Sequence, residues 1–149
     1  MKFEIPRPLK VEHDELHGEL VEATKAGGRT GEAAKTVAKL LHPHFVKEEE
    51  YALPPLGLLV ALSEGKFEAS MADVLKMTDR LKPELSTMLT EHKEIVAALA
   101  KLVDAAQAEN KPDVAHFAEK LMLHAQTEEQ VLYPAAILVG EIVKAKLPK

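Results

Sequence analysis

The amino-acid sequence predicts an all-α protein, an up-down-up-down four-helix bundle built from a duplicated helix pair, in a single domain over residues 1–149. Three observations lead to this prediction. A pattern of histidines and glutamates occurs twice along the chain. The composition, which is rich in Ala, Leu, Val, Glu and Lys and contains no Trp, favours helix. The length is sufficient for four helices of about 20 to 28 residues joined by short loops.

The repeat has two elements in each half of the chain. The first copy reads V-E-H-D-E-L around His13 and H-F-V-K-E-E-E-Y-A-L-P from His44 onward. The second copy reads T-E-H-K-E-I around His92 and H-A-Q-T-E-E-Q-V-L-Y-P from His124 onward. The first elements are 79 residues apart and the second elements are 80 apart. We therefore predict two helical hairpins related by a pseudo-two-fold axis.

The first hairpin is expected to begin with a helix over residues 9–26, where apolar residues and His13 recur on one face. The segment G-G-R-T-G at 27–31 ends this helix. The second helix follows directly and must break or kink at the proline pair that starts with Pro54. The apolar run 56–62 is expected to form a short capping helix or a buried connector.

The second hairpin is preceded by residues 70–81, which are expected to form a short helix of their own. Pro83 then either opens the third long helix or kinks it. That helix carries His92 on its inward face and continues to the N-K-P-D turn at 110–113. The fourth helix follows and is expected to kink near Pro134.

Each half contains a His-x-x-x-Glu pair, a spacing that places both side chains on one face of a helix. The pairs are His44 with Glu48 and His124 with Glu128, and both lie on the apolar side of their helices. Ionisable groups in an apolar core are costly unless they are paired or bind metal. Two adjacent metal ions would offset the carboxylates and use the imidazoles as neutral donors. Imidazole and carboxylate without sulfur suit iron, and also zinc, manganese or copper.

Composition excludes several other kinds of site. The chain has no Cys, which excludes zinc thiolate sites, iron–sulfur clusters and thiol catalysis by the chain alone. The formal net charge is −5, with both signs interspersed and no basic stripe of the sort that binds nucleic acid. The N-terminus M-K-F-E-I-P-R-P lacks an apolar signal core, and no apolar stretch approaches about 18 residues. We expect a cytoplasmic protein with no nucleic-acid or membrane partner.

The motifs resemble those of the hemerythrin-like family, also called HHE cation-binding domains. In that family a His lies on the first and third helices and His-x-x-x-Glu (or Asp) on the second and fourth, a pattern that this chain matches from about residue 11 to 134. The resemblance implies two iron ions, joined by an oxo or hydroxo group and bridged by two carboxylates. The implied ligands are His13, His44, Glu48, His92, His124 and Glu128.

One departure from the family concerns the third helix. Oxygen-carrying hemerythrins have His-x-x-x-His there, whereas Val96 stands four residues after His92 in this chain. The first helix has that spacing instead, from His13 to His17. Exchange of the two halves through the pseudo-two-fold restores five histidines. We therefore predict His17 as a further metal ligand, with an open coordination position near Val96.

Other polar residues around the motifs have more than one interpretation. Tyr51 is expected on the inward face, either as a core residue or as a catalytic candidate that binds metal or is oxidised beside it. Its counterpart in the repeat is Val131, which is also expected inward. The two remaining histidines, His42 and His116, are expected on the surface. The carboxylates beside the motifs are expected either to be solvated or to anchor an imidazole; they are Glu12, Glu49, Glu91 and Glu129.

The resemblance implies binding or processing of a small oxygen species: dioxygen, hydrogen peroxide or nitric oxide. Reversible oxygen binding and an enzymatic role, as a peroxide-decomposing (catalase-like) enzyme or another di-iron oxidoreductase, both remain open. One alternative is an iron- or oxygen-responsive sensing module that acts through a partner, since metal binding couples to folding in such bundles. Another is a structural bundle that holds zinc or no metal.

Overall fold

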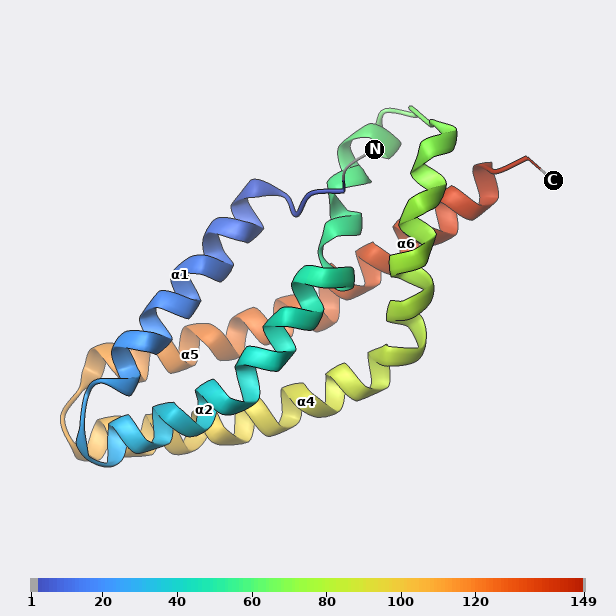
Figure 1. Cartoon of the computed structure of the whole chain (residues 1–149). Coiled ribbons are helices and arrows are strands. Elements are labelled where there is room, and N and C mark those ends of the chain that lie inside the picture. The colour runs from blue at the N-terminus through green and yellow to red at the C-terminus, as the bar shows by residue number, and fades with distance from the viewer. Residues whose placement is uncertain (1–2, 149) are drawn as a thin grey trace.

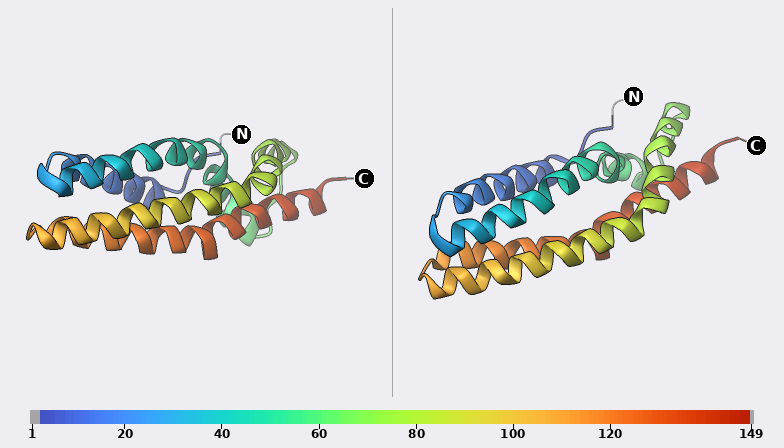
Figure 2. Two further views of the ribbon diagram at one scale, coloured as in Figure 1. Left: turned by 90° about the horizontal axis from the view of Figure 1, so that it is seen from below. Right: turned by 60° about the horizontal axis from the view of Figure 1, so that its bottom comes forward.

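The computed structural model describes residues 3–148, which form helices joined by short turns. Four long helical rods lie side by side (Figure 1), and the rotated views of Figure 2 show that they share one long axis. The first two rods are α1 (Arg7–Thr24) and α2 (Gly28–Lys47), the latter extended by the π-helical turn η1 (Glu48–Ala52). The third is α4 (Leu75–Ala108), and the fourth comprises α5 (Pro112–Thr127), the π-helical turn η4 (Glu128–Leu132) and α6 (Tyr133–Lys146). The predicted all-α four-helix bundle is confirmed.

A connector of short helices joins the second rod to the third. It comprises η2 (Pro54–Leu58), α3 (Leu59–Ser63) and η3 (Ala69–Val74), and it lies at the end of the bundle opposite the two hairpin turns (Figure 1). The expected connector over 56–62 is formed by η2 and α3. The expected separate helix over 70–81 is wrong, because η3 leads directly into α4 and Pro83 lies inside α4. Figure 1 shows that α4 is bent.

The two hairpin turns, which are equivalents in the repeat, are fastened to each other. The carboxylate of Glu109 accepts the backbone N–H groups of Arg29, at 3.1 Å, and Thr30, at 2.7 Å, as well as the Thr30 hydroxyl. These two N–H groups belong to the first turn of α2, where no helical partner exists for them. Across the same junction, the Lys111 ammonium donates to the carbonyl of Ala26. The end of the third rod therefore caps the start of the second.

The apolar core is divided by a layer of buried polar residues. On α4, His92 has the buried Met88 one turn before it and the buried Ile95 about one turn after it. Met88 belongs to a connector-side cluster that also includes Tyr51, Leu53, Leu56 and Tyr133. Ile95 belongs to a turn-side cluster that also includes Leu16, Leu20, Val37, Leu99 and Leu121. None of the helices in the described residues is both long and apolar enough to span a lipid bilayer.

Candidate metal centre

Six ionisable side chains from all four rods are buried in the polar layer. They are the residues that the family resemblance implied as ligands: His13, His44, Glu48, His92, His124 and Glu128. Their ligand atoms form two groups, and within each group these atoms lie within 4.8 Å of one another. The His44–His92 group consists of His44, Glu48, His92 and Glu128, and the His13–His124 group consists of His13, His124 and Glu128. Glu128 is common to both groups.

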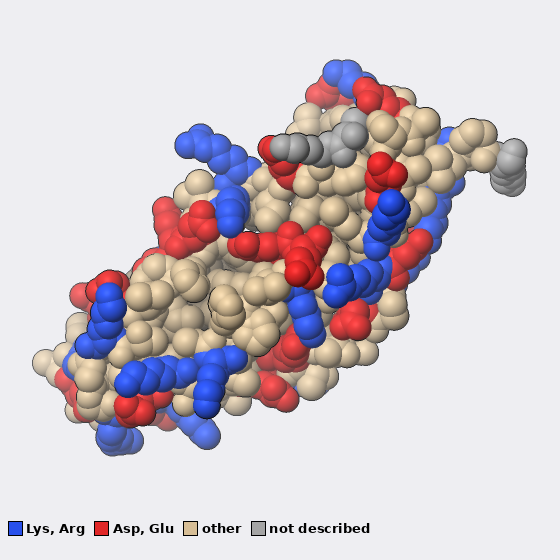
Figure 3. Space-filling model, viewed as in Figure 1, with Lys and Arg blue, Asp and Glu red and all other residues tan. Residues whose placement is uncertain are grey.

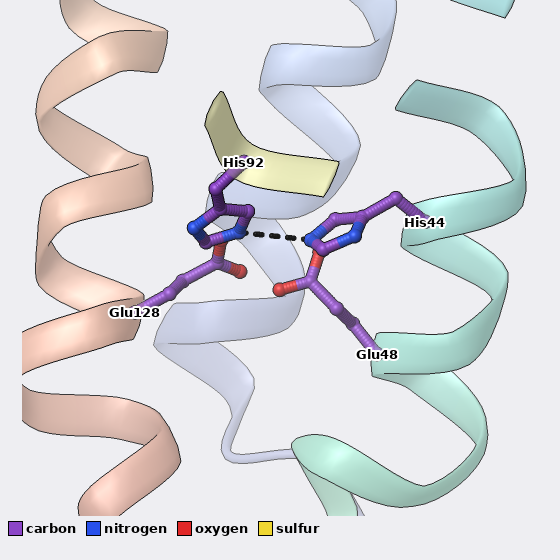
Figure 4. Close-up of side chains that lie close together, drawn as sticks. All are labelled: His44, Glu48, His92 and Glu128. Atoms are coloured by element: carbon purple, nitrogen blue, oxygen red, sulfur yellow. Dashed lines mark hydrogen bonds and ion pairs between the residues drawn. The ribbon is translucent and has the colours of Figure 1, made fainter. Parts of the chain in front are cut away.

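The two imidazoles of the His44–His92 group point at each other (Figure 4), with 2.9 Å between their Nε2 atoms. The Nε2 of His92 is 3.2 Å from Glu128, and that of His44 is 3.5 Å from Glu48. When the proton of each neutral ring is on Nδ1, two nitrogen lone pairs face each other in a buried space. A cation between them would remove this repulsion and would be stabilised by the carboxylates.

Both carboxylates also face the His13–His124 group. Glu128 has one oxygen near His92 and the other 3.3 Å from the Nε2 of His124. The Nε2 of His13 is 3.6 Å from Glu48 and 3.7 Å from Glu128. Each carboxylate therefore lies between imidazoles of the two groups, as a bridging ligand would.

The outer nitrogen of every imidazole is directed at a glutamate on a neighbouring rod. Because a carboxylate only accepts hydrogen bonds, it favours the proton on Nδ1 and leaves the Nε2 lone pair for a metal. The Nδ1 pairs are His44 with Glu91 at 3.1 Å, His92 with Glu129 at 2.9 Å, His13 with Glu49 at 3.5 Å, and His124 with Glu12. Glu12, Glu91 and Glu129 anchor an imidazole by a hydrogen bond, which is one of the two expectations for these glutamates, whereas Glu49 lies beside His13 without such a bond.

Burial and local charge set the protonation of the centre. Burial opposes the charge on Glu48, but the nearby imidazoles of His13 and His44 and the hydrogen bond from Tyr133 outweigh it, so the pKa of Glu48 is lowered. Burial lowers the pKa of His92, helped by the charge of His44, and burial also lowers the pKa of His124. Burial opposes the charge on His13 as well, but Glu48 and Glu49 outweigh it, so the pKa of His13 is raised. Metal ions bind the ionised carboxylate and the neutral imidazole.

The centre also contains most of the buried side-chain atoms that lack a hydrogen-bond partner. Seven such atoms occur in the described residues, and the two outside the centre belong to Tyr51 and Thr78. The other five are both ring nitrogens of His13, Oε1 of Glu48, Nε2 of His124 and Oε2 of Glu128. Buried polar atoms without partners are rare and costly. A metal ion coordinated by the Nε2 atoms of His13 and His124 and by the two carboxylate oxygens would satisfy four of these five atoms, so the residues present fit a metal site.

A π-helical turn follows the ligand carboxylate in each half. The N–H of Leu53 bonds to the carbonyl of Glu48, and the N–H of Tyr133 bonds to that of Glu128, five residues back in both cases. A proline, Pro54 or Pro134, lies two residues after the end of each turn. Proline has no backbone N–H and so cannot donate an α-helical hydrogen bond. The extra residue per turn rotates the following residues by about 100° relative to an α-helix.

This rotation brings Tyr133 into the centre, a residue that the sequence reasoning missed. Its hydroxyl donates to Glu48 at 2.8 Å and lies 3.1 Å from the Nε2 atoms of both His44 and His92. Burial, reinforced by the charge of Glu48, raises the pKa of Tyr133 far above its usual value. In α-helical register, position 133 would lie opposite His124, and only the paired prolines in the repeat signalled a change of register.

Tyr51, the tyrosine singled out from the sequence, is elsewhere. It is buried in the connector-side cluster, with the Arg80 guanidinium 4.3 Å from its ring centroid. Its hydroxyl makes no hydrogen bond within the described residues. Its repeat counterpart Val131 is 55% exposed, so the expectation that Val131 points inward is wrong.

His17 is not brought into either group, in contrast to the expectation of a fifth imidazole. Its side chain is exposed, because the buried face of α1 runs through His13, Leu16 and Leu20 and leaves His17 at its border. Val96, expected beside an open position, is 38% exposed. The two histidines expected on the surface, His42 and His116, are exposed.

Comparison with known proteins agrees with this centre. The chain matches the family described as the hemerythrin HHE cation-binding domain over residues 5–136. Neither the curated protein sequences nor the solved structures searched gave a match. The matched range contains all six buried His and Glu residues of the centre. The fold, the buried His/Glu groups and this match together show that the chain belongs to the hemerythrin HHE cation-binding domain family.

Proposed function

We propose that this protein is a non-haem di-iron protein that binds or processes a small oxygen species at the His/Glu centre. The observation that carries the proposal is the convergence of imidazole Nε2 atoms on two shared carboxylates. The Nδ1 atoms of His44, His92 and His124 are hydrogen-bonded to outer glutamates, and that of His13 lies 3.5 Å from Glu49. Nitrogen and oxygen donors without sulfur suit iron. Iron would supply a redox-active ion with coordination positions that the protein does not fill, since these side chains offer fewer donors than two octahedral ions require.

The protein's own residues would make the two halves of the centre different. Tyr133 lies beside the His44–His92 group and contacts neither His13 nor His124 by a hydrogen bond. The phenol is placed to fill a position on its side of the centre. We infer that a small ligand is taken up on the opposite side, at the His13–His124 group.

The metal content of the purified chain tests the proposal. Protein produced with iron supplied and purified without chelator should contain about two iron ions per chain. His44→Ala should lose iron, because it removes a buried imidazole whose two nitrogens are both engaged. His42→Ala is the matched control, since this exposed residue lies two positions away on α2 and should retain full iron content.

Reactivity is then measured on the same preparations. Iron-loaded protein should consume hydrogen peroxide or change its visible spectrum with dioxygen or nitric oxide, and His44→Ala should not. Zinc alone, or no metal, in the wild-type protein would contradict the proposal and would favour a structural bundle. Two irons with no response to any of the three molecules would contradict the assignment of a small oxygen species.

A further inference from the structure

A cavity of about 270 Å³ lies between α1 and α2, on the flank of the candidate metal centre. Since one water molecule occupies roughly 30 Å³ in the liquid, the cavity can hold several molecules of that size. Figure 3 shows the face between these helices as a hollowed area of uncharged residues with charged side chains along its borders. The lining residues are His17, Leu20, Val21, Thr24, Ala38, Leu41, His42 and Phe45.

The inner wall of this cavity is apolar. Its buried members are Leu20, Leu41 and Phe45, and none of them carries a polar side-chain atom. The hydroxyl of Thr24 already donates to the carbonyl of Val21, at 2.6 Å. The polar groups that remain are the two exposed imidazoles, which lie at the outer edge. An apolar molecule would be accepted in the inner part, whereas a polar one would lose its hydrogen bonds to water there.

One aromatic ring separates the cavity from the centre. Phe45 lines the cavity on one side and stacks on the other side against His13, with 4.1 Å between ring centroids and 28° between ring planes. His13 belongs to the group that Tyr133 does not contact. The cavity therefore leads to the side of the centre that the proposed function leaves for an external ligand.

We propose that this cavity is the entry route of a small, uncharged, apolar diatomic gas, and that the Phe45 ring is its gate. Dioxygen and nitric oxide belong to this class and hydrogen peroxide does not. The proposal rests on the proposed function, because it assumes that the His13–His124 group takes up the ligand. His17 and His42 are exposed and lie at the entrance of the cavity.

Xenon tests the cavity without reference to iron. Apolar cavities bind xenon, a probe of similar size and no polarity. The full-length protein under xenon pressure should show xenon between α1 and α2, by crystallography or by xenon NMR. Ala38→Phe, which places a ring in the cavity, should abolish this signal. Ala97→Phe, an exposed substitution on α4, is the matched control and should leave it unchanged. No xenon in the wild-type cavity would overturn the proposal.

Rapid mixing tests the route. In reduced, iron-loaded protein, Ala38→Phe should slow the association of nitric oxide by about tenfold, a barrier increase of about 1.4 kcal/mol. Phe45→Leu should speed it, because the substitution removes the ring and keeps an apolar side chain. Ala97→Phe should react at the wild-type rate. Iron content is measured for each variant, so that a loss of metal is distinguished from a change of route.

The outcomes separate this inference from the proposed function. If Ala38→Phe keeps its iron and binds nitric oxide at the wild-type rate, the entry route is wrong and the di-iron proposal stands. If Ala38→Phe slows peroxide consumption but not gas binding, the proposed class of ligand is wrong. If the wild-type protein holds no iron, the proposed function is wrong. The cavity is then not a route to a metal ion, even if it binds xenon.

Discussion

Tyr133 is the residue that makes the two halves of a duplicated site chemically different. Its counterpart in the repeat, nine residues after His44, is Leu53, which is buried and apolar. At equivalent positions of the repeat, one half therefore has a phenol and the other an alkyl side chain. The hydroxyl has defined partners on both neighbouring rods, namely Glu48 and His92. A buried polar group with such contacts affects both stability and chemistry.

We expect Tyr133→Phe to alter both properties. It removes the donor to Glu48, so the metal-free protein should lose about 1–3 kcal/mol of unfolding free energy, the usual cost of leaving a buried acceptor unsatisfied. If the phenol binds ferric iron, a visible absorption band should also disappear. Urea unfolding and absorption spectroscopy measure the two effects. Tyr51→Phe is the matched control, and a band that survived Tyr133→Phe but not Tyr51→Phe would contradict this role.

Single residues also show where sequence reasoning succeeds and where it fails. The helical i, i+4 rule placed His44 with Glu48, and His124 with Glu128, because each pair ends at the first residue of a π-turn. After those turns the same rule fails, and Tyr133 is fully buried where the α-helical register predicted an outward residue. The change of register is a change in the backbone hydrogen bonds of the helix. The pattern of apolar and polar side chains does not indicate it, and only the paired prolines point to it.

The four outer glutamates should govern metal affinity although they are not themselves in the ligand groups. Glu129→Gln would replace an acceptor by an amide that no longer favours the proton on Nδ1 of His92. We expect a loss of about 10–100-fold in metal affinity. Competition with a coloured chelator measures this loss. Glu119→Gln, on the exposed side of the same rod, should bind metal with wild-type affinity. Equal affinities in the two variants would refute the anchoring role.

Among the helical elements, the N-terminus of α2 depends on a residue from another rod. The hydrogen bonds from Thr30, through its hydroxyl and backbone N–H, and from the Arg29 N–H hold the pKa of Glu109 at about 2. Because the folded-state pKa is lowered, the cap stabilises the fold above the usual pKa of a glutamate. This contribution is lost as the pH falls through about 2.

Glu109→Gln should therefore lower the Tm at neutral pH, and the difference from wild type should shrink between about pH 4.5 and pH 2. Asp104→Asn, an exposed change nearby on α4, should have no such effect. An NMR titration of the Glu109 carboxyl gives the pKa directly, and Thr30→Val should raise it. A Glu109 pKa close to the usual value in the wild-type protein would show that the cap is absent in solution.

The contact between α4 and α6 requires a glycine. A Cβ on Gly140 would lie 2.7 Å from the Cβ of Thr78 and closer still to its hydroxyl. Gly140→Ala should cost about 1–3 kcal/mol of unfolding free energy, as overpacking in a core does. In contrast, a Cβ on Gly18 in α1 meets no atom within 4 Å, so Gly18→Ala should stabilise by about 0.5–1 kcal/mol. Denaturant unfolding of the two variants compares a buried glycine with an exposed one.

Helices that depend on local sequence patterns could be predicted from the sequence, whereas features that depend on tertiary packing could not. Composition and the duplicated motif were sufficient for four long rods. For Pro83, local rules left two outcomes open, the start of the third long helix or a kink within it, and could not choose between them. Leu81 and Met88, on either side of Pro83, are both buried in the connector-side cluster. Their packing holds the two parts of α4 in one bent helix.

At the scale of the whole molecule, the duplication extends beyond the ligands to their outer partners. Glu12 of α1 holds His124, and its counterpart Glu91 of α4 holds His44. Every such contact crosses between rods, so the pairs tie the bundle together around the centre. The lysines that pair with the outer glutamates are not duplicated in the repeat. Lys47 pairs with Glu91, at 3.1 Å, and Lys10 pairs with Glu49, at 3.0 Å. Their repeat counterparts, at positions 127 and 89, are Thr and Leu.

Because the centre joins all four rods, bound metal should stabilise the entire fold. Without a cation, the buried carboxylates and facing Nε2 atoms have no common positive partner. A metal that binds only the folded chain adds about 2.7 kcal/mol at a free concentration of 100 times its Kd. Chelation should therefore lower the unfolding free energy and the Tm, and added ferrous iron should restore both. His124→Ala should reduce this metal-dependent increment, and His116→Ala, an exposed histidine on the same helix, should preserve it. Equal unfolding free energies for loaded and chelated wild-type protein would mean that the ion binds outside the cooperative core, contrary to the buried centre.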